Sequence, residues 1–192
     1  MVNKKDFEEI RKELEEYDDK REELIKSTRD IIKLSKHIIY SIHRNELKIA
    51  EQNIKVIKDL ISKLSSKVKK DPKLDIGSFK AAVQEYVEAV CYFHYVKNKK
   101  LLSHRELGVE SEYYLLGVCD LTGELVRNAV NAGIKGETKS VIEIKDFVDE
   151  IYDELMQFDL RNSELRKKVD QVKWDLKKLD DLVFTLKVKK RK

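Results

Sequence analysis

Residues 165–186 read LRKKVDQVKWDLKKLDDLVFTL, and their spacing points to the fold class of the whole chain. Apolar side chains recur alternately four and three residues apart, at Leu165, Val169, Val172, Leu176, Leu179, Val183 and Leu186. This spacing places them along one seam of an α-helix. We therefore predict a long C-terminal helix, whose seam packs either within the chain or against another subunit.

The rest of the chain holds few residues that end helices or form tight turns. It has six glycines and one proline among 192 residues, whereas these two types together make up about 12% of an average protein. β-Sandwiches, barrels and glycine-rich nucleotide-binding folds need more such turns. We predict an all-α protein: a single domain over residues 1–192, an antiparallel bundle of about six to seven helices, with a basic tail at residues 187–192.

Turn residues and capping motifs indicate where these helices begin and end. The expected breaks lie at Asn45, around Pro72 and Gly77, at Gly108, at residues 133–136 and near Asp159. Two Ser-x-x-Glu sequences, Ser103 with Glu106 and Ser140 with Glu143, are capping boxes, in which hydroxyl and carboxylate satisfy free backbone N–H groups. They predict helices that begin just after Ser103 and Ser140.

Composition excludes several classes of protein. The chain is 41% hydrophobic and 40% charged, with a net charge of +4, which is too apolar for a disordered polyelectrolyte. No apolar run reaches the roughly 18–20 residues of a membrane span, and the charged residues 1–19 do not resemble a signal peptide. Cys91 and Cys119 lie in apolar helical patterns without CxxC spacing, so we expect buried free thiols. We expect a cytoplasmic protein without a membrane partner.

A basic stripe is predicted on the helix that contains residues 24–44. Its apolar side chains fall on one face, and the opposite face carries Arg29, Lys33, Lys36, Tyr40 and Arg44. Cations with an aromatic ring among them suit contact with phosphates and stacking on bases. The alternative, a charged face that is only solvated, is the commoner role of such stripes.

The helix predicted at residues 78–97 has apolar residues on two faces, so we expect it to be covered on both sides. Glu85 and Glu88, three residues apart, lie together on the second face. Two carboxylates held close repel each other, which makes a divalent cation a natural partner. The spacing alone does not identify a metal site, because similar acid pairs occur at Glu13/Glu16, Asp146/Asp149 and Glu150/Asp153. A ferritin-like di-iron centre is disfavoured, because the chain has no Glu-x-x-His sequence.

Three blocks of sequence resemble the translin family, and in particular its Trax (translin-associated factor X) branch. They are RDI at residues 29–31 followed by SK at 35–36 and by Ile39, His43 and Arg44, then QEYVEAV at residues 84–90, and YLLGV at 114–118 followed by DLTGEL at 120–125. Residues 160–186 are more similar to translin itself. The resemblance extends over residues 21–187, which is nearly the whole chain.

The resemblance implies a helical bundle that assembles into a hollow octamer and binds single-stranded nucleic acid. It also raises a question of chemistry, because Trax is a magnesium-dependent endoribonuclease whereas translin binds nucleic acid without cutting it. Two glutamates of the Trax site match Glu85 and Glu88, and its aspartate matches Asp153 in the Tyr152-Asp153 dipeptide. The chain departs from Trax at the next position, where Glu154 replaces a glycine.

We therefore predict an endoribonuclease in which Glu85, Glu88 and Asp153 are the catalytic residues and hold Mg²⁺ or Mn²⁺. The metal would polarise a phosphodiester oxygen and activate a water molecule. Single-stranded RNA, or single-stranded DNA, would contact Arg29, Lys33, Lys36, Arg44 and Lys80. Two alternatives stay open: a non-catalytic oligomer that binds single strands, and a structural helical oligomer without nucleic acid.

Overall fold

A computed structural model describes residues 2–161 and 163–189, and in this part of the chain every regular element is helical. The all-α prediction is confirmed. The elements are α1 (Lys4–His43), α2 (Leu47–Lys70), the 3₁₀ turn η1 (Pro72–Leu74), α3 (Gly77–Asn98), α4 (His104–Leu107), α5 (Ser111–Ile134), α6 (Thr138–Met156) and α7 (Glu164–Lys189). Helix α7 thus continues into the predicted basic tail, whose residues 190–192 lie outside the described part.

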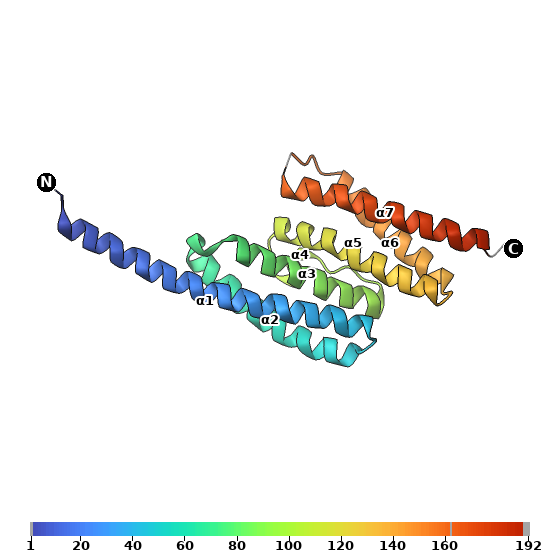
Figure 1. The fold of residues 1–192 in the computed structure, drawn as a ribbon, viewed down its shortest axis with the longest axis horizontal. Helices are drawn as coiled ribbons and strands as arrows, with labels where there is room; N and C mark the ends of the chain where they lie inside the picture. Colours follow the sequence, from blue (N-terminus) through green and yellow to red (C-terminus); the bar gives the residue numbers. More distant parts are fainter. Residues whose placement is uncertain (1, 162, 190–192) are drawn as a thin grey trace.

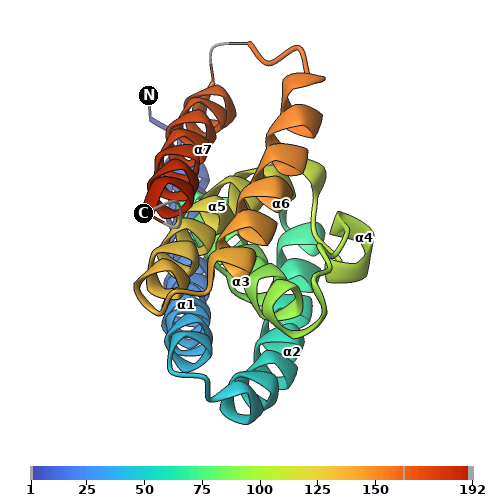
Figure 2. The ribbon, with the colours of Figure 1, turned by 90° about the vertical axis from the view of Figure 1, so that its right-hand side faces the viewer.

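The long helices pack in three layers. Helices α3 and α5 form the middle layer, α1 and α2 pack on the side of α3, and α6 and α7 pack on the side of α5 (Figures 1 and 2). As predicted, α3 is covered on more than one side, and even its tyrosines Tyr86, Tyr92 and Tyr95 are buried. None of the helices described has the length and apolar content of a membrane-crossing segment.

Helices α3 and α5 approach each other closely at Gly117. A Cβ atom added there would lie 2.6 Å from the Cβ of Val87 and 2.8 Å from the carbonyl oxygen of Gln84. Because residues three and seven positions later share a helix face with Gly117, the contact also directs Asp120 and Glu124 of α5 toward α3. This close approach positions the site described below.

The seam of α7 packs within the chain. Leu165, Val169, Val172 and Leu179 are buried, and α7 contacts both α5 and α6. The buried Asp175 accepts a hydrogen bond from the Thr122 hydroxyl at 3.0 Å, which links α7 to α5. Of the two arrangements open for this seam, the intramolecular one is found.

Most predicted breaks are found, and one capping motif is not. Gly108 adopts a left-handed conformation (φ +69°), and Ser103 and Glu106 form the expected capping box. The second box, at Ser140, was a wrong prediction, because α6 already begins at Thr138. Gly136, at φ +78°, completes the preceding turn, so that Ser140 lies inside the helix. Cys91 and Cys119 are buried free thiols, as expected.

Helix α1 projects beyond the bundle at its N-terminal end (Figure 1). We call residues 4–16 the N-terminal arm; all of them are exposed. Phe7, Ile10 and Leu14 form an apolar stripe along it, with exposed fractions of 56%, 44% and 58%. At the base of the arm, the Tyr17 hydroxyl donates a hydrogen bond to the Lys73 carbonyl oxygen at 3.2 Å.

Candidate functional site

Three helices enclose a cavity of about 220 Å³ that contains several carboxylates; we call it the acidic cavity. Helix α3 contributes Glu85 and Glu88, whose three-residue spacing puts both on one face. The other residues that line the acidic cavity are Lys36, Ile39 and Tyr40 of α1 and Glu124 and Arg127 of α5. The predicted pair of glutamates therefore lies in a cavity, opposite a carboxylate from another helix.

The environment of Glu88 disfavours its charge. Burial, together with the nearby carboxylates of Asp120, Glu85 and Glu124, raises the pKa of Glu88 to about 8. Burial also raises the pKa of Glu85, although the Lys36 ammonium opposes that shift. A bound cation would reverse this balance, because positive charge favours the ionised carboxylates.

The two acids of α5 already have partners. The Lys168 ammonium pairs with both oxygens of Asp120, at 2.5 Å and 2.7 Å. Glu124 Oε2 lies 2.5 Å from His43 Nε2 and 3.7 Å from the Arg127 guanidinium. By contrast, Glu85 and Glu88 have no hydrogen bond or ion pair with any residue that the structure describes. These two carboxylates are therefore the ones whose charge a bound cation would stabilise most.

The donor set fits a hard divalent cation in its chemistry, since Mg²⁺ prefers carboxylate oxygens. Within residues 2–161 and 163–189, however, no three acidic, histidine or cysteine side chains converge closely enough to hold a metal ion as they stand. Asp120 is paired with Lys168 and Glu124 with His43. A cation would have to compete with Lys168 for Asp120.

The structure does not bring Asp153 to the two glutamates. Asp153 lies on the exposed side of α6 and does not line the acidic cavity. The reason is the layering of the bundle: α6 packs on α5 and α7, and it is α5 that lies across from Glu85 and Glu88. The predicted placement of Asp153 beside Glu85 and Glu88 is therefore wrong, and the acids of α5 nearest to these two glutamates are Asp120 and Glu124.

The sequence analysis did not predict these two acids as site residues, although both belong to the DLTGEL block at residues 120–125 that resembles Trax. Asp120 and Glu124 are four residues apart, so they share a helix face. Gly117 lies three residues earlier on the same face, and a glycine inside a helix often marks a close approach of another backbone. A glycine and two acids on one face of α5 thus indicate, in the sequence, the face that contacts α3.

The predicted nucleic-acid contacts separate into three groups. Arg29, Lys33, Lys36 and Tyr40, with Ile32 and His37, line a shallow groove on α1 of about 410 Å³, which we call the basic groove. Lys36 and Tyr40 line the acidic cavity as well. The basic groove therefore leads directly to the carboxylates.

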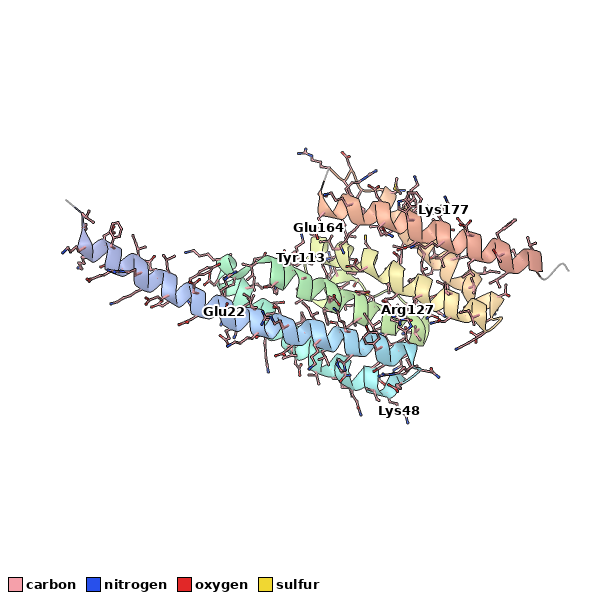
Figure 3. The ribbon with its side chains drawn as sticks, in the orientation of Figure 1. Glu22, Lys48, Tyr113, Arg127, Glu164 and Lys177 are labelled. Atoms are coloured by element: carbon pink, nitrogen blue, oxygen red, sulfur yellow. The ribbon has the colours of Figure 1, made fainter. Side chains whose placement is uncertain are left out.

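Arg44 and Lys80 do not belong to the basic groove. The Arg44 guanidinium pairs with Glu46 at 3.1 Å in the turn after α1. The Lys80 ammonium pairs with Glu112 and Glu164, each at 3.1 Å, and so joins α3 to α5 and α7; Glu164 is labelled in Figure 3. Lys80 thus links three helices, and its role in binding phosphate stays a prediction.

Comparisons with known proteins agree with this fold. Residues 19–190 match the model of the translin family. Translin-associated protein X of Mus musculus is 30% identical over 152 residues, which are 60% of this chain and 52% of that protein. The chain thus spans about half the length of this curated relative.

Two solved structures superpose over almost the whole chain. The crystal structure of apo-NeC3PO has a TM-score of 0.88 at 28% identity, covering 97% of this chain and 98% of that one. The complex of AfC3PO with duplex RNA has a TM-score of 0.86 at 30% identity, covering 95% of this chain and 96% of that one.

Proposed function

The chain belongs to the translin family, and we propose that it is a divalent-cation-dependent endoribonuclease acting on single-stranded RNA. One observation carries this proposal: Lys36 and Tyr40 line both the basic groove and the acidic cavity. A strand bound along the groove would bring a phosphodiester to the carboxylates. The duplex RNA in the solved AfC3PO complex supports RNA binding, and the resemblance of the QEYVEAV block to Trax supports cleavage.

Side chains of the basic groove would bind and orient the strand. Arg29 and Lys33 would contact backbone phosphates, and Lys36, at the edge of the cavity, would hold the phosphate to be cut. Tyr40 is 51% exposed, and the Arg127 guanidinium lies 6.0 Å from the centre of its ring. An exposed ring at this position would stack on a base, with little preference among bases.

The carboxylates of the cavity would hold the cation. Glu85 and Glu88 would be ligands from α3, and Asp120 and Glu124 would be the candidates from α5. Mg²⁺, or Mn²⁺ in its place, would stabilise charge on a phosphodiester oxygen and lower the pKa of a water molecule. Lys168, displaced from Asp120, would remain beside the site as a further contact for the negatively charged substrate.

A cleavage assay tests the proposal. Purified protein is incubated with end-labelled single-stranded RNA in Mg²⁺, Mn²⁺ or EDTA, with duplex RNA and single-stranded DNA as competitors. Internal cuts that require the metal are expected, and Glu88→Gln and Asp120→Asn should abolish them while RNA binding persists. Asp153→Asn is the matched control, because this exposed acid lies outside the cavity. Loss of cleavage in Asp153→Asn with activity in Asp120→Asn would contradict the site.

A second candidate is a non-catalytic oligomer that binds single strands. It is favoured by the pairing of Asp120 with Lys168 and by the absence of a converging metal cage in the described residues. In the same assay, a stable mobility shift without cuts at any metal concentration would support this candidate over the enzyme.

We also propose that the chain self-assembles, as a homo-octamer of about 180 kDa from eight chains of 22.6 kDa. The apolar stripe of the N-terminal arm supports self-association, because Phe7, Ile10 and Leu14 contact no core of their own chain and would be buried against a second copy.

A further inference from the structure

A chain of hydrogen bonds reaches the acidic cavity from three helices. Asn128 Nδ2, on α5, donates to the Tyr92 hydroxyl oxygen at 3.1 Å. That hydroxyl, on α3, lies 3.3 Å from His43 Nδ1, and His43 Nε2, on α1, lies 2.5 Å from Glu124 Oε2. The proposed reaction leaves His43, Tyr92 and Asn128 without a role.

The donors and acceptors in this chain can be assigned in one consistent direction. The amide of Asn128 donates to the Tyr92 oxygen, which leaves the hydroxyl hydrogen for another acceptor. The atom within reach is His43 Nδ1, so Nδ1 accepts. A neutral imidazole then carries its hydrogen on Nε2, and that N–H donates to Glu124.

Packing holds the imidazole in place. The side chain of His43 is only 9% exposed and that of Glu124 22% exposed. The ring of Tyr92, which is buried, lies 5.2 Å from the His43 ring, centre to centre, at an angle of 44°. Few rotamers of His43 are compatible with these neighbours, so its N–H keeps one direction.

The fixed imidazole makes the two carboxylate oxygens of Glu124 unequal. Its Oε2 atom faces both His43 and Arg127, whereas Oε1 has no hydrogen-bond or ion-pair partner among the residues described. One oxygen of the carboxylate is therefore fixed, and the other is available to a ligand in the cavity.

We propose that His43 is a positioning residue of the metal site, which holds Glu124 through Oε2 so that Oε1 is presented to the divalent cation. The proposal rests on the function proposed above. Tyr92 and Asn128 act one step further away, by fixing the tautomer and orientation of the imidazole. Removing such an outer partner of a metal ligand typically costs about 10–100-fold in metal affinity or activity.

If His43 only supported the fold, replacing it would change stability and leave metal binding unchanged. His43, Tyr92 and Asn128 also line a second cavity, of about 510 Å³. The imidazole thus borders an open cavity and does not fill a closed apolar core. An apolar residue of similar size should then preserve the fold and still disturb the carboxylate.

The test compares His43→Leu, which removes the donor, with His43→Gln, which keeps an N–H near the position of Nε2. Tyr92→Phe removes only the hydroxyl, and His94→Leu is the matched control, a partly buried histidine of α3 outside both cavities. Mn²⁺ affinity is measured by calorimetry without RNA, and kcat and KM for single-stranded RNA are measured separately. Circular dichroism confirms folding.

We expect His43→Leu to weaken Mn²⁺ binding about 10-fold or more and to lower kcat at limiting metal, with KM for RNA unchanged. His43→Gln should restore most of the affinity, Tyr92→Phe should be intermediate, and His94→Leu should match the unmodified protein. If His43→Leu does not fold, the Gln and Phe variants carry the comparison.

Two outcomes overturn the proposal in distinguishable ways. If the unmodified protein binds Mn²⁺ and cuts RNA, and His43→Leu binds Mn²⁺ equally well, His43 does not position Glu124, and the proposed function stands. If the unmodified protein binds no Mn²⁺, both the proposed function and the role of His43 are wrong.

Discussion

At the scale of single residues, Glu88 shows what the cavity does to a carboxylate. Its side chain is partly buried and lies near the carboxylates of Asp120, Glu85 and Glu124, so its charged form is disfavoured and its pKa is raised to about 8. Without a cation, the protonated form of Glu88 is therefore favoured over a wider range of pH than that of an exposed glutamate. Metal binding and ionisation of Glu88 are linked, because each favours the other.

This linkage predicts a pH-dependent stability. The pKa of Glu88 rises on folding from 4.5 to about 8, so its contribution is fully present below pH 4.5 and is lost as pH rises to 8. In EDTA, the melting temperature of the unmodified protein should fall relative to that of Glu88→Gln between pH 5 and pH 8.5. Calorimetry checks this, with the exposed Glu23→Gln as control. Parallel curves for the unmodified protein and Glu88→Gln would contradict the buried, charge-disfavoured environment.

At the scale of elements, the distance between α3 and α5 decides how closely Asp120 and Glu124 approach Glu85 and Glu88. Gly117 sets that distance, because any side chain there would meet Val87 and the backbone at Gln84. Gly123, six residues later in the same helix, has nothing within 4 Å of where a Cβ would be. Substituting each glycine by alanine therefore compares a tightly packed position of α5 with an open one.

Gly117→Ala should destabilise the fold by about 1–3 kcal/mol, the usual effect of overpacking. It should also weaken Mn²⁺ binding, because α5 must move away from Glu85 and Glu88. Gly123→Ala should instead stabilise the protein by roughly 0.5–1 kcal/mol, since alanine favours a helix over glycine. Urea denaturation of both variants measures the difference. Equal effects would show that the α3–α5 contact does not depend on Gly117.

The basic groove is formed by residues of a single helix, α1. Residues 29, 33, 36 and 40 recur three and four positions apart, so a single helix presents Arg29, Lys33, Lys36 and Tyr40 on one side. The groove needs no loop to form it, which is why the sequence pattern alone located these four side chains.

Neutralising the groove should flatten the salt dependence of RNA binding. Each phosphate contact contributes about 0.7 to the slope of log affinity against log salt for single strands, so Lys33→Gln/Lys36→Gln should lower the slope by roughly 1.4. Lys55→Gln/Lys63→Gln on α2 removes two exposed lysines elsewhere and controls for net charge. Filter binding over a salt series gives the slopes. A slope unchanged by the groove substitutions would show that RNA binds another face.

At the scale of the whole molecule, the N-terminal arm is the part that a single chain leaves uncovered. Its apolar stripe continues the seam of α1 at heptad spacing: Ile10 and Tyr17 are in register with the buried Leu24, and Phe7 and Leu14 with the buried Thr28. The same seam is core in the bundle and surface in the arm. The charged composition of residues 1–19 concealed this continuity in the sequence.

Ile10→Ser/Leu14→Ser should therefore reduce self-association without unfolding the bundle, because the arm contacts little of its own chain. Light scattering should give a mass well below the 180 kDa expected of the octamer, while helicity by circular dichroism stays close to that of the unmodified protein. Glu9→Ser/Glu13→Ser, which changes charged positions of the same arm, is the matched control. An unchanged mass in the apolar double variant would place the interface elsewhere.

The sequence alone determined whatever depends on spacing within one helix: the all-α class, the seam of α7, the basic groove and the pairing of Glu85 with Glu88. Tertiary structure decided which side chains from different helices meet. Asp120 and Glu124 face the α3 glutamates and Asp153 does not, and Lys80 is held between Glu112 and Glu164. The physical reason is that helix geometry fixes the angle between residues three or four apart, whereas the rotation and distance between two helices follow from packing, here from the contact of Gly117 with Val87.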